Sequence, residues 1–331
     1  MKKIQKILYV SQGLTDEASA MKQALSIAGN NNSELKILLV CPELPKEMKD
    51  YKDRYESSLV DQVKQSIRSA HDAINHGNTA ESTDIEVDSS DPFLIRYGKS
   101  TIQVEVESGS IPAARIIRQV LRNAHDLLIK EAEPIEGGKG FKGIEMELLR
   151  KCPCPVLLTH PISRPRNQIK VAVAVDPASL TPEGHELSLG LLEISRSYAD
   201  RCSGELQIIS CWDYGIENAL SQNPWMTMES EIVDEIMRDY RNESRTALDN
   251  LIQQAKISGK MQVHHVRGSA EKVIPDWIEE NSIDILVMGT VARKGIEGFV
   301  FGNTAENVVQ KLGCSLLTLK PNGFVSPVKP Y

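Results

Sequence analysis

Four glycines between residues 284 and 312 suggest a loop that could hold an anion. They follow an apolar, strand-like run, "IDILVMG", and continue through "TVARKGIEGFVFG", at Gly289, Gly295, Gly298 and Gly302. Because glycine has no side chain, the backbone there can turn tightly and approach a ligand closely. The segment fits neither of two familiar phosphate-binding patterns, G-x-x-x-x-G-K-[ST] and G-x-G-x-x-G.

The residues after the last of these glycines predict a helix. We expect Asn303 or Thr304 at its N-cap, with Glu306 available for a capping interaction. N–H groups at a helix start bind phosphate well, and Arg293 and Lys294 would add positive charge. An ordinary capped helix after a loop would give the same pattern, but the order of strand, loop and cap favours an anion site.

Two other predicted strand ends carry candidate binding groups. Asp176 follows "KVAVAV", and its carboxylate could accept hydrogen bonds from an amino group or hydroxyl of a ligand. An aspartate before Pro177 could equally form a turn or cap a helix. Near the end of "ELQIISCW", a backbone group at Cys211 could contact the edge of a flat ring, although the thiol itself gives no such signal.

The elements that would position these residues occur twice along the chain. Each half begins with an apolar strand, "QKILYVS" or "QIKVAVAVD", and continues through the same series of helices and strands. Asp126 matches Asp284 and Cys154 matches Cys314, at nearly the same offset along the chain. Proline and polar residues interrupt the pattern in "HPISRPRNQ". We therefore predict two domains, residues 1–160 and 168–331.

The alternation of short apolar strands with helices predicts an α/β fold. Each half should form a Rossmann-like open parallel sheet with helices on both faces and right-handed crossovers. Ligands of such sheets bind beyond the carboxyl ends of the strands, where the strand order reverses. The candidate groups named above all lie at predicted carboxyl ends.

Composition and charge narrow the class of protein. The chain has 331 residues, of which 41% are hydrophobic, and its net charge is −7. Nucleic acid is not an expected partner, because binding a phosphate backbone normally needs a concentrated basic surface. We expect no membrane span and no secretion signal, since the apolar runs are too short for either, and we expect a cytoplasmic location.

Cysteine spacing does not favour a metal site. Cys152 and Cys154 lie near His160, but C-x-C is not the usual C-x-x-C spacing and no second pair lies nearby. We therefore predict no metal, and we expect the thiols to be reduced. The sequence shows no recognisable Ser-His-Asp or Cys-His arrangement and no G-x-S-x-G motif. We therefore do not expect a dedicated hydrolase.

At the glycine segment the chain resembles the universal stress protein family, in particular its tandem two-domain (E-type) members. Nucleotide-binding members carry Gly, two residues, Gly, nine residues, and Gly followed by Ser or Thr. Gly289 and Gly302 match the outer glycines, whereas Ala292 replaces the middle glycine and Asn303 the hydroxyl residue. "GNTAE", "CSLLTLKPNGF", "HDLLIK" and "LLRKCPCPV" also resemble the tandem subfamily.

The resemblance implies an adenine nucleotide alpha hydrolase-like fold that binds ATP or AMP in the second domain only. By position, Asp176 would contact adenine or ribose and the Cys211 backbone would contact adenine. The remaining residues would lie under the ribose or around the phosphates: Met288, Gly289, Ala292, Gly302, Asn303, Thr304 and Ala305. If the middle position needs a positive φ, Ala292 costs about 1 kcal/mol or changes the loop path, which would weaken ATP binding or favour a smaller adenine nucleotide.

The first half departs further from the family pattern. Ser11 replaces the aspartate, Lys130 and Glu131 occupy the positions of Met288 and Gly289, and Lys142 replaces the glycine at the helix start. A glutamate beside a phosphate would repel it. We expect this half to bind no nucleotide or to bind a different ligand.

Family members pair through their last strand, so the resemblance implies that the two halves form an internal pseudo-dimer. Further association into a homodimer is left open. The favoured function is a stress-response protein that binds an adenine nucleotide and acts through unidentified protein partners. The alternatives are a slow ATPase or phosphotransferase, and a scaffold or small-ligand carrier that binds no nucleotide.

Overall fold

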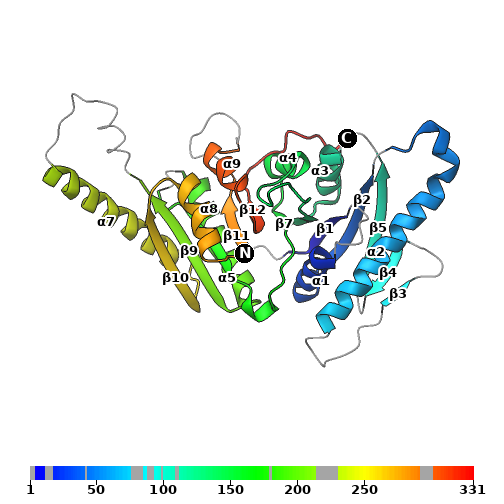
Figure 1. The fold of residues 1–331 in the computed structure, drawn as a ribbon, viewed down its shortest axis with the longest axis horizontal. Helices are drawn as coiled ribbons and strands as arrows, with labels where there is room; N and C mark the ends of the chain where they lie inside the picture. The colour runs from blue at the N-terminus through cyan, green and yellow to red at the C-terminus, as the bar shows by residue number, and fades with distance from the viewer. Residues whose placement is uncertain are drawn as a thin grey trace. The chain divides into compact units, whose positions relative to one another are not determined.

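The computed structural model describes residues 4–11, 18–41, 43–75, 85–87, 93–97, 100–108, 112–178, 181–213, 230–290 and 301–331. Its contacts divide the chain into two compact units. The first-half unit contains residues 2–163, 315–318 and 324–331, and the second-half unit contains residues 164–314 and 319–323. Figure 1 shows the elements of both units.

The sheet of the first-half unit has the strand order β12-β7-β6-β1-β2-β5-β4-β3. Its parallel strands are β1 (Lys6–Ser11), β2 (Glu34–Cys41), β5 (Ser100–Ser108), β6 (Leu127–Glu131) and β7 (Val156–Thr159). At one edge β3 (Ile85–Val87) and β4 (Leu94–Tyr97) join antiparallel to each other, with β4 antiparallel to β5. β12 (Ser315–Leu319) pairs antiparallel with β7.

The β7–β12 pair joins the last strands of the two sequence repeats. Leu316 lies opposite Leu158 and Leu317 opposite Leu157, and all four side chains are buried. The His160 N–H also donates to Ser315 Oγ at 2.9 Å. The packing of the two halves as an internal pseudo-dimer, and further association into a homodimer, stay predictions.

The C-terminal tail also belongs to the first-half unit. Arg122 Nε donates to the Pro330 carbonyl at 2.6 Å, and Ser326 Oγ donates to the Lys151 carbonyl at 2.7 Å. The tail therefore lies against α3 (Pro112–Asn123) and the end of α4 (Gly143–Lys151), and the C-terminus is near α3 in Figure 1.

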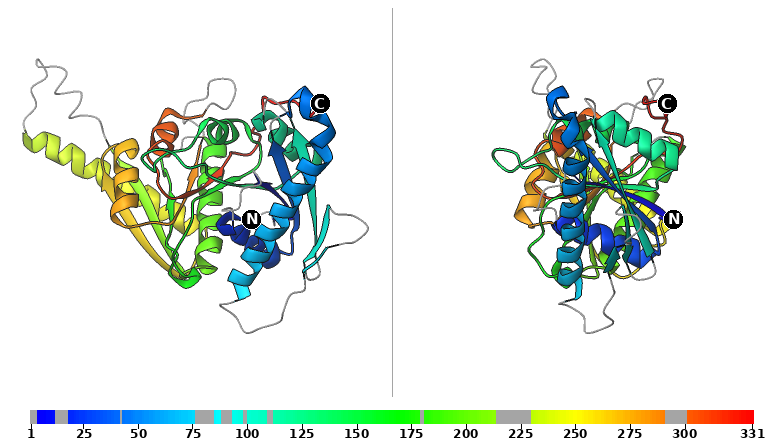
Figure 2. Two further views of the ribbon diagram at one scale, coloured as in Figure 1. Left: turned by 45° about the vertical axis from the view of Figure 1, so that its right-hand side comes forward. Right: turned by 90° about the vertical axis from the view of Figure 1, so that its right-hand side faces the viewer.

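The second-half unit has the strand order β10-β9-β8-β11, with every pair parallel. These strands are β8 (Val171–Ala174), β9 (Glu205–Trp212), β10 (Lys260–Arg267) and β11 (Ile285–Gly289), and β9 and β10 run side by side in Figure 2. β9 and β11 lie on opposite sides of β8, so the strand order reverses between β8 and β11. In the first-half unit it reverses at β1 and β6.

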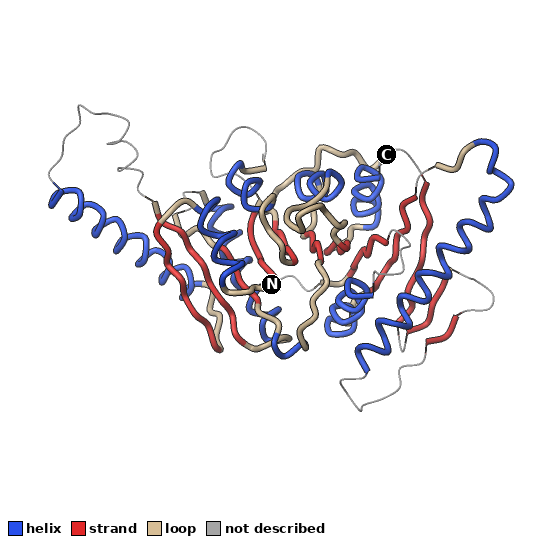
Figure 3. Tube along the Cα trace, viewed as in Figure 1, coloured by secondary structure: helices blue, strands red, loops and turns tan. Residues whose placement is uncertain are grey.

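Helices cover both faces of each sheet, as the sequence predicted, and Figure 3 shows them in blue around the red strands. In the second half, α5 (Pro182–Asp200) packs with α7 (Ser230–Gln254), and α8 (Ala270–Glu280) packs with α9 (Asn303–Val309). In the first half, α1 (Ala18–Asn31) packs with α2 (Lys52–Asn75), and α3 packs with α4. The short 3-10 helices are η1 (Lys46–Tyr51) and η2 (Arg166–Gln168).

Burial on both faces explains why the inner strands read as continuous apolar runs. In β11, Ile285, Leu286 and Val287 are completely buried. Of the helices that the structure describes, none is long and apolar enough to cross a membrane.

The repeated aspartates Asp126 and Asp284 tie together the starts of neighbouring strands. Asp126 Oδ2 accepts hydrogen bonds from the N–H groups of Gln5 and Lys6, at 3.0 and 3.1 Å. Asp284 Oδ2 likewise accepts from the Lys170 N–H at 2.8 Å and from Arg164 Nη1 at 3.0 Å. Their conspicuous match between the two halves therefore reflects a structural role.

We predict that Asp284→Ala lowers the free energy of unfolding by about 1–2 kcal/mol, because a main-chain donor and a guanidinium lose their acceptor. Denaturant unfolding would measure the change. Asp249→Ala is the matched control, since it removes an exposed pair with Arg245 within one helix. Equal, small effects of the two substitutions would contradict the prediction.

His125 predicts a pH dependence of stability. Its side chain is 7% exposed, and neither ring nitrogen has a hydrogen-bond partner among the described residues. Burial, together with the positive charges of Lys36 and Lys6, lowers the pKa of His125 from 6.5 to about 4. The unfolded chain therefore takes up the proton at a higher pH than the folded chain.

Folding stability should accordingly fall as the pH drops from about 6.5 to about 4, with His125 contributing up to about 3 kcal/mol. His125→Gln should make this loss shallower, as measured by denaturant unfolding at several pH values. An unchanged pH profile in the variant would show that His125 is not the group responsible.

Candidate functional site

The register of the second-half sheet brings three predicted residues to the line where its parallel strands end, the carboxyl edge of this sheet. Ala174 pairs with Met288 on one side and with Ile209 on the other. Asp176 and Cys211 each lie two residues beyond this paired row, and Gly289 lies one residue beyond it. The carboxyl edge at the strand-order reversal therefore contains the candidate groups from three strands.

The Asp176 side chain participates in a turn. Its Oδ1 accepts the Ala178 N–H at 3.1 Å, and Ser188 Oγ donates to its carbonyl at 3.4 Å. The turn that the sequence offered as an alternative is thus present. A carboxylate has about four acceptor positions, so forming this turn does not prevent a ligand contact.

Cys211 lies in β9 opposite Val266 of β10. Burial raises the pKa of its thiol to about 11. The thiol is therefore protonated at neutral pH and is a poor nucleophile. This state suits a residue that offers its backbone to a ligand and does not take part in chemistry.

The end of β11 is shaped by packing. Met288 is buried, at 6% exposure. A Cβ added at Gly289 would lie 3.0 Å from Leu187 Cδ2 of α5. The close approach of α5 is thus a structural reason for glycine at this position, beside any role in ligand binding.

The N-cap of α9 is Gly302, with φ −75° and ψ 137°. The expectation of Asn303 or Thr304 at the N-cap is wrong by one or two residues, because helical hydrogen bonding already begins when the Gly302 carbonyl accepts the Glu306 N–H at 2.9 Å. Its negative φ also means that Gly302 is not required for a left-handed conformation. Among the residues that the structure describes, no side chain caps the start of α9.

The N-cap position of Gly302 determines which main-chain N–H groups could bind an anion. The Gly302 N–H donates to the Thr290 carbonyl at 3.0 Å, so that amide is already used. Within the described part of the chain, the N–H groups of Asn303, Thr304 and Ala305 have no acceptor, as is normal for a first helical turn. Ala292, Arg293 and Lys294 lie outside the described residues.

Lys320, which no sequence pattern indicated, lies beside Thr290 and Phe301. Its ammonium donates to Thr290 Oγ1 at 2.8 Å, and it lies 5.7 Å from the centre of the Phe301 ring. Thr290 is completely buried. The signal that could have found Lys320 is its place in the repeat, where it matches His160 of the first half.

At the corresponding place in the first half, a buried carboxylate occupies the helix start. Glu145 and Lys130 are 0% and 1% exposed, and Glu145 Oε1 lies 2.7 Å from Lys130 Nζ. Glu145 also accepts the Lys142 N–H at 2.7 Å and the Glu133 N–H at 3.2 Å. The first half thus satisfies its helix start with an anion of its own, which the sequence analysis missed when it considered Glu131.

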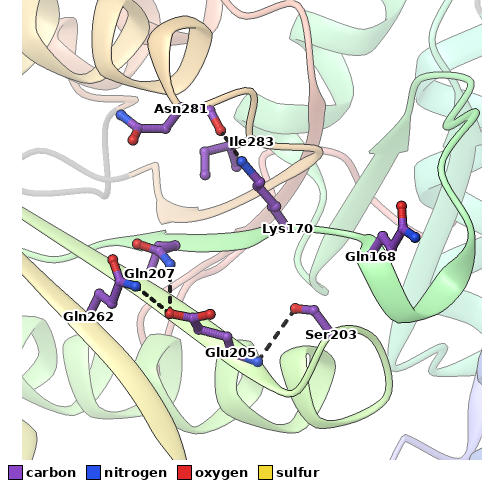
Figure 4. Close-up of a pocket in the computed structure, with 8 residues that line it drawn as sticks. All are labelled: Gln168, Lys170, Ser203, Glu205, Gln207, Gln262, Asn281 and Ile283. Carbon is purple, nitrogen blue, oxygen red and sulfur yellow. Dashed lines mark hydrogen bonds between the residues drawn. The ribbon is translucent and has the colours of Figure 1, made fainter.

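A separate hollow of about 370 Å³ lies at the amino ends of the second-half strands (Figure 4). Its polar groups largely bond to one another: Lys170 Nζ donates to the Asn281 carbonyl at 2.9 Å, and Glu205 Oε1 accepts from Gln262 at 2.5 Å. It lies at the end of the sheet opposite Asp176 and Gly289. The full lining is Gln168, Lys170, Ser203, Glu205, Gln207, Gln262, Asn281 and Ile283.

Cys152 and Cys154 are both buried, with their sulfur atoms 3.6 Å apart. Among the residues with described positions, no group of three or more His, Cys, Asp or Glu side chains could hold a metal ion.

The fold agrees with the comparisons with known proteins. The model of the universal stress protein family matches residues 3–160 and 170–320, so the chain belongs to the universal stress protein family and contains two of its domains. It is similar to Universal stress protein E of Photorhabdus laumondii, at 28% identity over 99% of both chains. Universal stress protein E of Escherichia coli K12 is 31% identical over 69% of this chain and 71% of its own length.

Two solved structures share the fold over nearly the whole chain. A protein of unknown function from Pseudomonas aeruginosa PAO1 has a TM-score of 0.65 and 24% identity, covering 96% of this chain and 93% of its own. A universal stress protein from Archaeoglobus fulgidus has a TM-score of 0.59 and 16% identity, covering 97% of this chain and 99% of its own. Membership of the family supports a role in the stress response.

The buried carboxylate of the first half generates a prediction. Glu145→Gln should lower the free energy of unfolding by about 3 kcal/mol, because Lys130 would keep a buried charge without its closest counter-ion. Thermal or denaturant unfolding would measure this. Glu147→Gln, which breaks an exposed pair with Lys151 in the same helix, should change stability by less than about 0.5 kcal/mol. If Glu145→Gln were equally harmless, the ion pair would not be a structural requirement.

Proposed function

We propose that the protein binds an adenine nucleotide at the carboxyl edge of the second-half sheet, and that it acts in the stress response through protein partners and not by turnover. The observation that carries this proposal is the convergence of Asp176, Cys211 and Gly289 at the strand-order reversal. Ligands of open parallel sheets bind at such an edge.

The groups at this edge have the chemistry that a nucleotide needs. The Asp176 carboxylate can accept hydrogen bonds from adenine or ribose, while the Cys211 backbone can contact the adenine edge. The first-turn amides of α9, at Asn303, Thr304 and Ala305, can donate to phosphate. ATP and AMP are both candidates, and binding in the second domain only is supported by Glu145, which fills the equivalent position in the first.

The two domains are proposed as residues 1–160 and 168–331, with the protein in the cytoplasm. β12 belongs to the second domain by sequence, but its residues 315–318 pack with the first-half unit. A separated second domain would therefore lose the partner of β12, and binding should be tested on the full chain.

The test is calorimetric titration of the full chain with ATP, ADP and AMP, comparing wild type with Gly302→Asp. An aspartate suits the N-cap backbone found at Gly302, so its carboxylate should accept the first-turn amides and repel phosphate. We expect wild type to bind and the variant to lose at least about tenfold in affinity, with a melting temperature that is unchanged or higher.

Ser203→Asp adds the same charge at the opposite edge of the unit and should leave nucleotide affinity unchanged. Absence of binding by wild type at millimolar nucleotide, or equal affinity of wild type and Gly302→Asp, would refute the proposed function.

A further inference from the structure

The two repeats place a ring contact at the same point beside the helix start. In the first half, the Phe141 and His160 rings are 5.4 Å apart between centroids. At the matching positions of the second half, the Lys320 ammonium lies 5.7 Å from the centre of the Phe301 ring. A residue that follows the last strand thus packs on the phenylalanine before the helix in both halves, but only the second half has a lysine there.

The charge of the first-half residue is different. Burial lowers the pKa of His160, although the Glu145 carboxylate opposes this. The imidazole is therefore neutral near pH 7, and the positive charge beside the helix start comes from Lys130 on β6, which pairs with Glu145.

Neither member of that ion pair has a charged residue at the matching position of the second half. In the repeat, Ala305 occupies the position of Glu145, and Met288 occupies the position of Lys130. Neither side chain can supply a charge. The second half has therefore exchanged an internal carboxylate at the helix start for a methyl group, while placing an ammonium at position 320.

The ammonium of Lys320 is held in a defined place. It donates to Thr290 Oγ1 at 2.8 Å, and the carbonyl of this same threonine accepts the Gly302 N–H at 3.0 Å. Packing on the Phe301 ring restricts the lysine further. Its charge is thus fixed beside the residues that lead into α9.

We infer that Lys320 is a further ligand-binding residue, whose ammonium neutralises the phosphate groups of the nucleotide. It does for an external anion what Lys130 does for Glu145 in the first half. This inference rests on the proposed function and specifies its ligand class: the site takes an adenine nucleotide through its phosphate charge, so it discriminates ATP from the uncharged nucleoside adenosine.

The experiment is calorimetric titration of the full chain with ATP and with adenosine, for wild type, Lys320→Gln, Lys320→Arg and Lys311→Gln. Lys320→Gln should weaken ATP binding about tenfold or more, the usual effect of losing a charge-assisted contact, and leave adenosine binding unchanged. Lys320→Arg should keep most of the ATP affinity. Lys311 donates to the Glu271 carbonyl near the other end of α9, so Lys311→Gln controls for loss of a positive charge.

The outcomes separate this inference from the proposed function. If wild type binds ATP and Lys320→Gln binds it within about twofold of wild type, the assignment of Lys320 is wrong and the proposed function stands. If Lys320→Gln weakens the binding of ATP and of adenosine equally, Lys320 supports the fold of the site and does not contact phosphate, which also overturns the inference. If wild type binds neither ligand, both fall. Thermal melting of each variant shows whether it is folded. If Lys320→Gln does not fold, Lys320→Arg still tests the inference.

Discussion

The parallel pairing of β8 with β9 and β11 is the constraint on which the candidate site depends. Ala174 is paired in register with Ile209 and Met288, so the residues just beyond that row lie together at the carboxyl ends of the strands. Parallel strands all point in one direction, so their carboxyl ends collect groups that are far apart in the chain. A shift of one residue in this register would turn the side chains to the other face.

The helix start that follows the fourth strand of each repeat differs between the two halves. In the first half a carboxylate, Glu145, accepts main-chain amides and lies against Lys130, and both of these side chains are shielded from solvent. Removing two charges from water is costly, and only close pairing with further hydrogen bonds compensates for it. In the second half Gly302 provides no capping side chain. Glu145 thus caps the helix start of the first half, whereas in the second half the first-turn amides of α9 have no acceptor among the described residues.

Much of the fold and part of the site could be predicted from the sequence. Alternating apolar strands and helices, repeated in the same order in both halves of the chain, correctly predicted two α/β halves with helices on both faces. The strand ends at Asp176, Cys211 and Gly289 were also placed correctly at one edge, because strand direction follows from the topology. The N-cap was predicted one or two residues too late, since Asn303 is by type a better capping residue than Gly302. Type alone cannot show that the Gly302 carbonyl accepts the first helical bond.

By itself, the sequence determined the repeat, the order of the elements and membership of the family, since these depend on local periodicity and on residues at fixed spacing. Only the tertiary structure decided that Glu145 fills the first helix start, that Thr290 takes the Gly302 amide and that Lys320 lies beside it. It also decided that β12 and the C-terminal tail pack with the first half. Each of these depends on contacts between residues distant in the chain, which are set by how strands and helices pack and not by the residues adjacent in sequence.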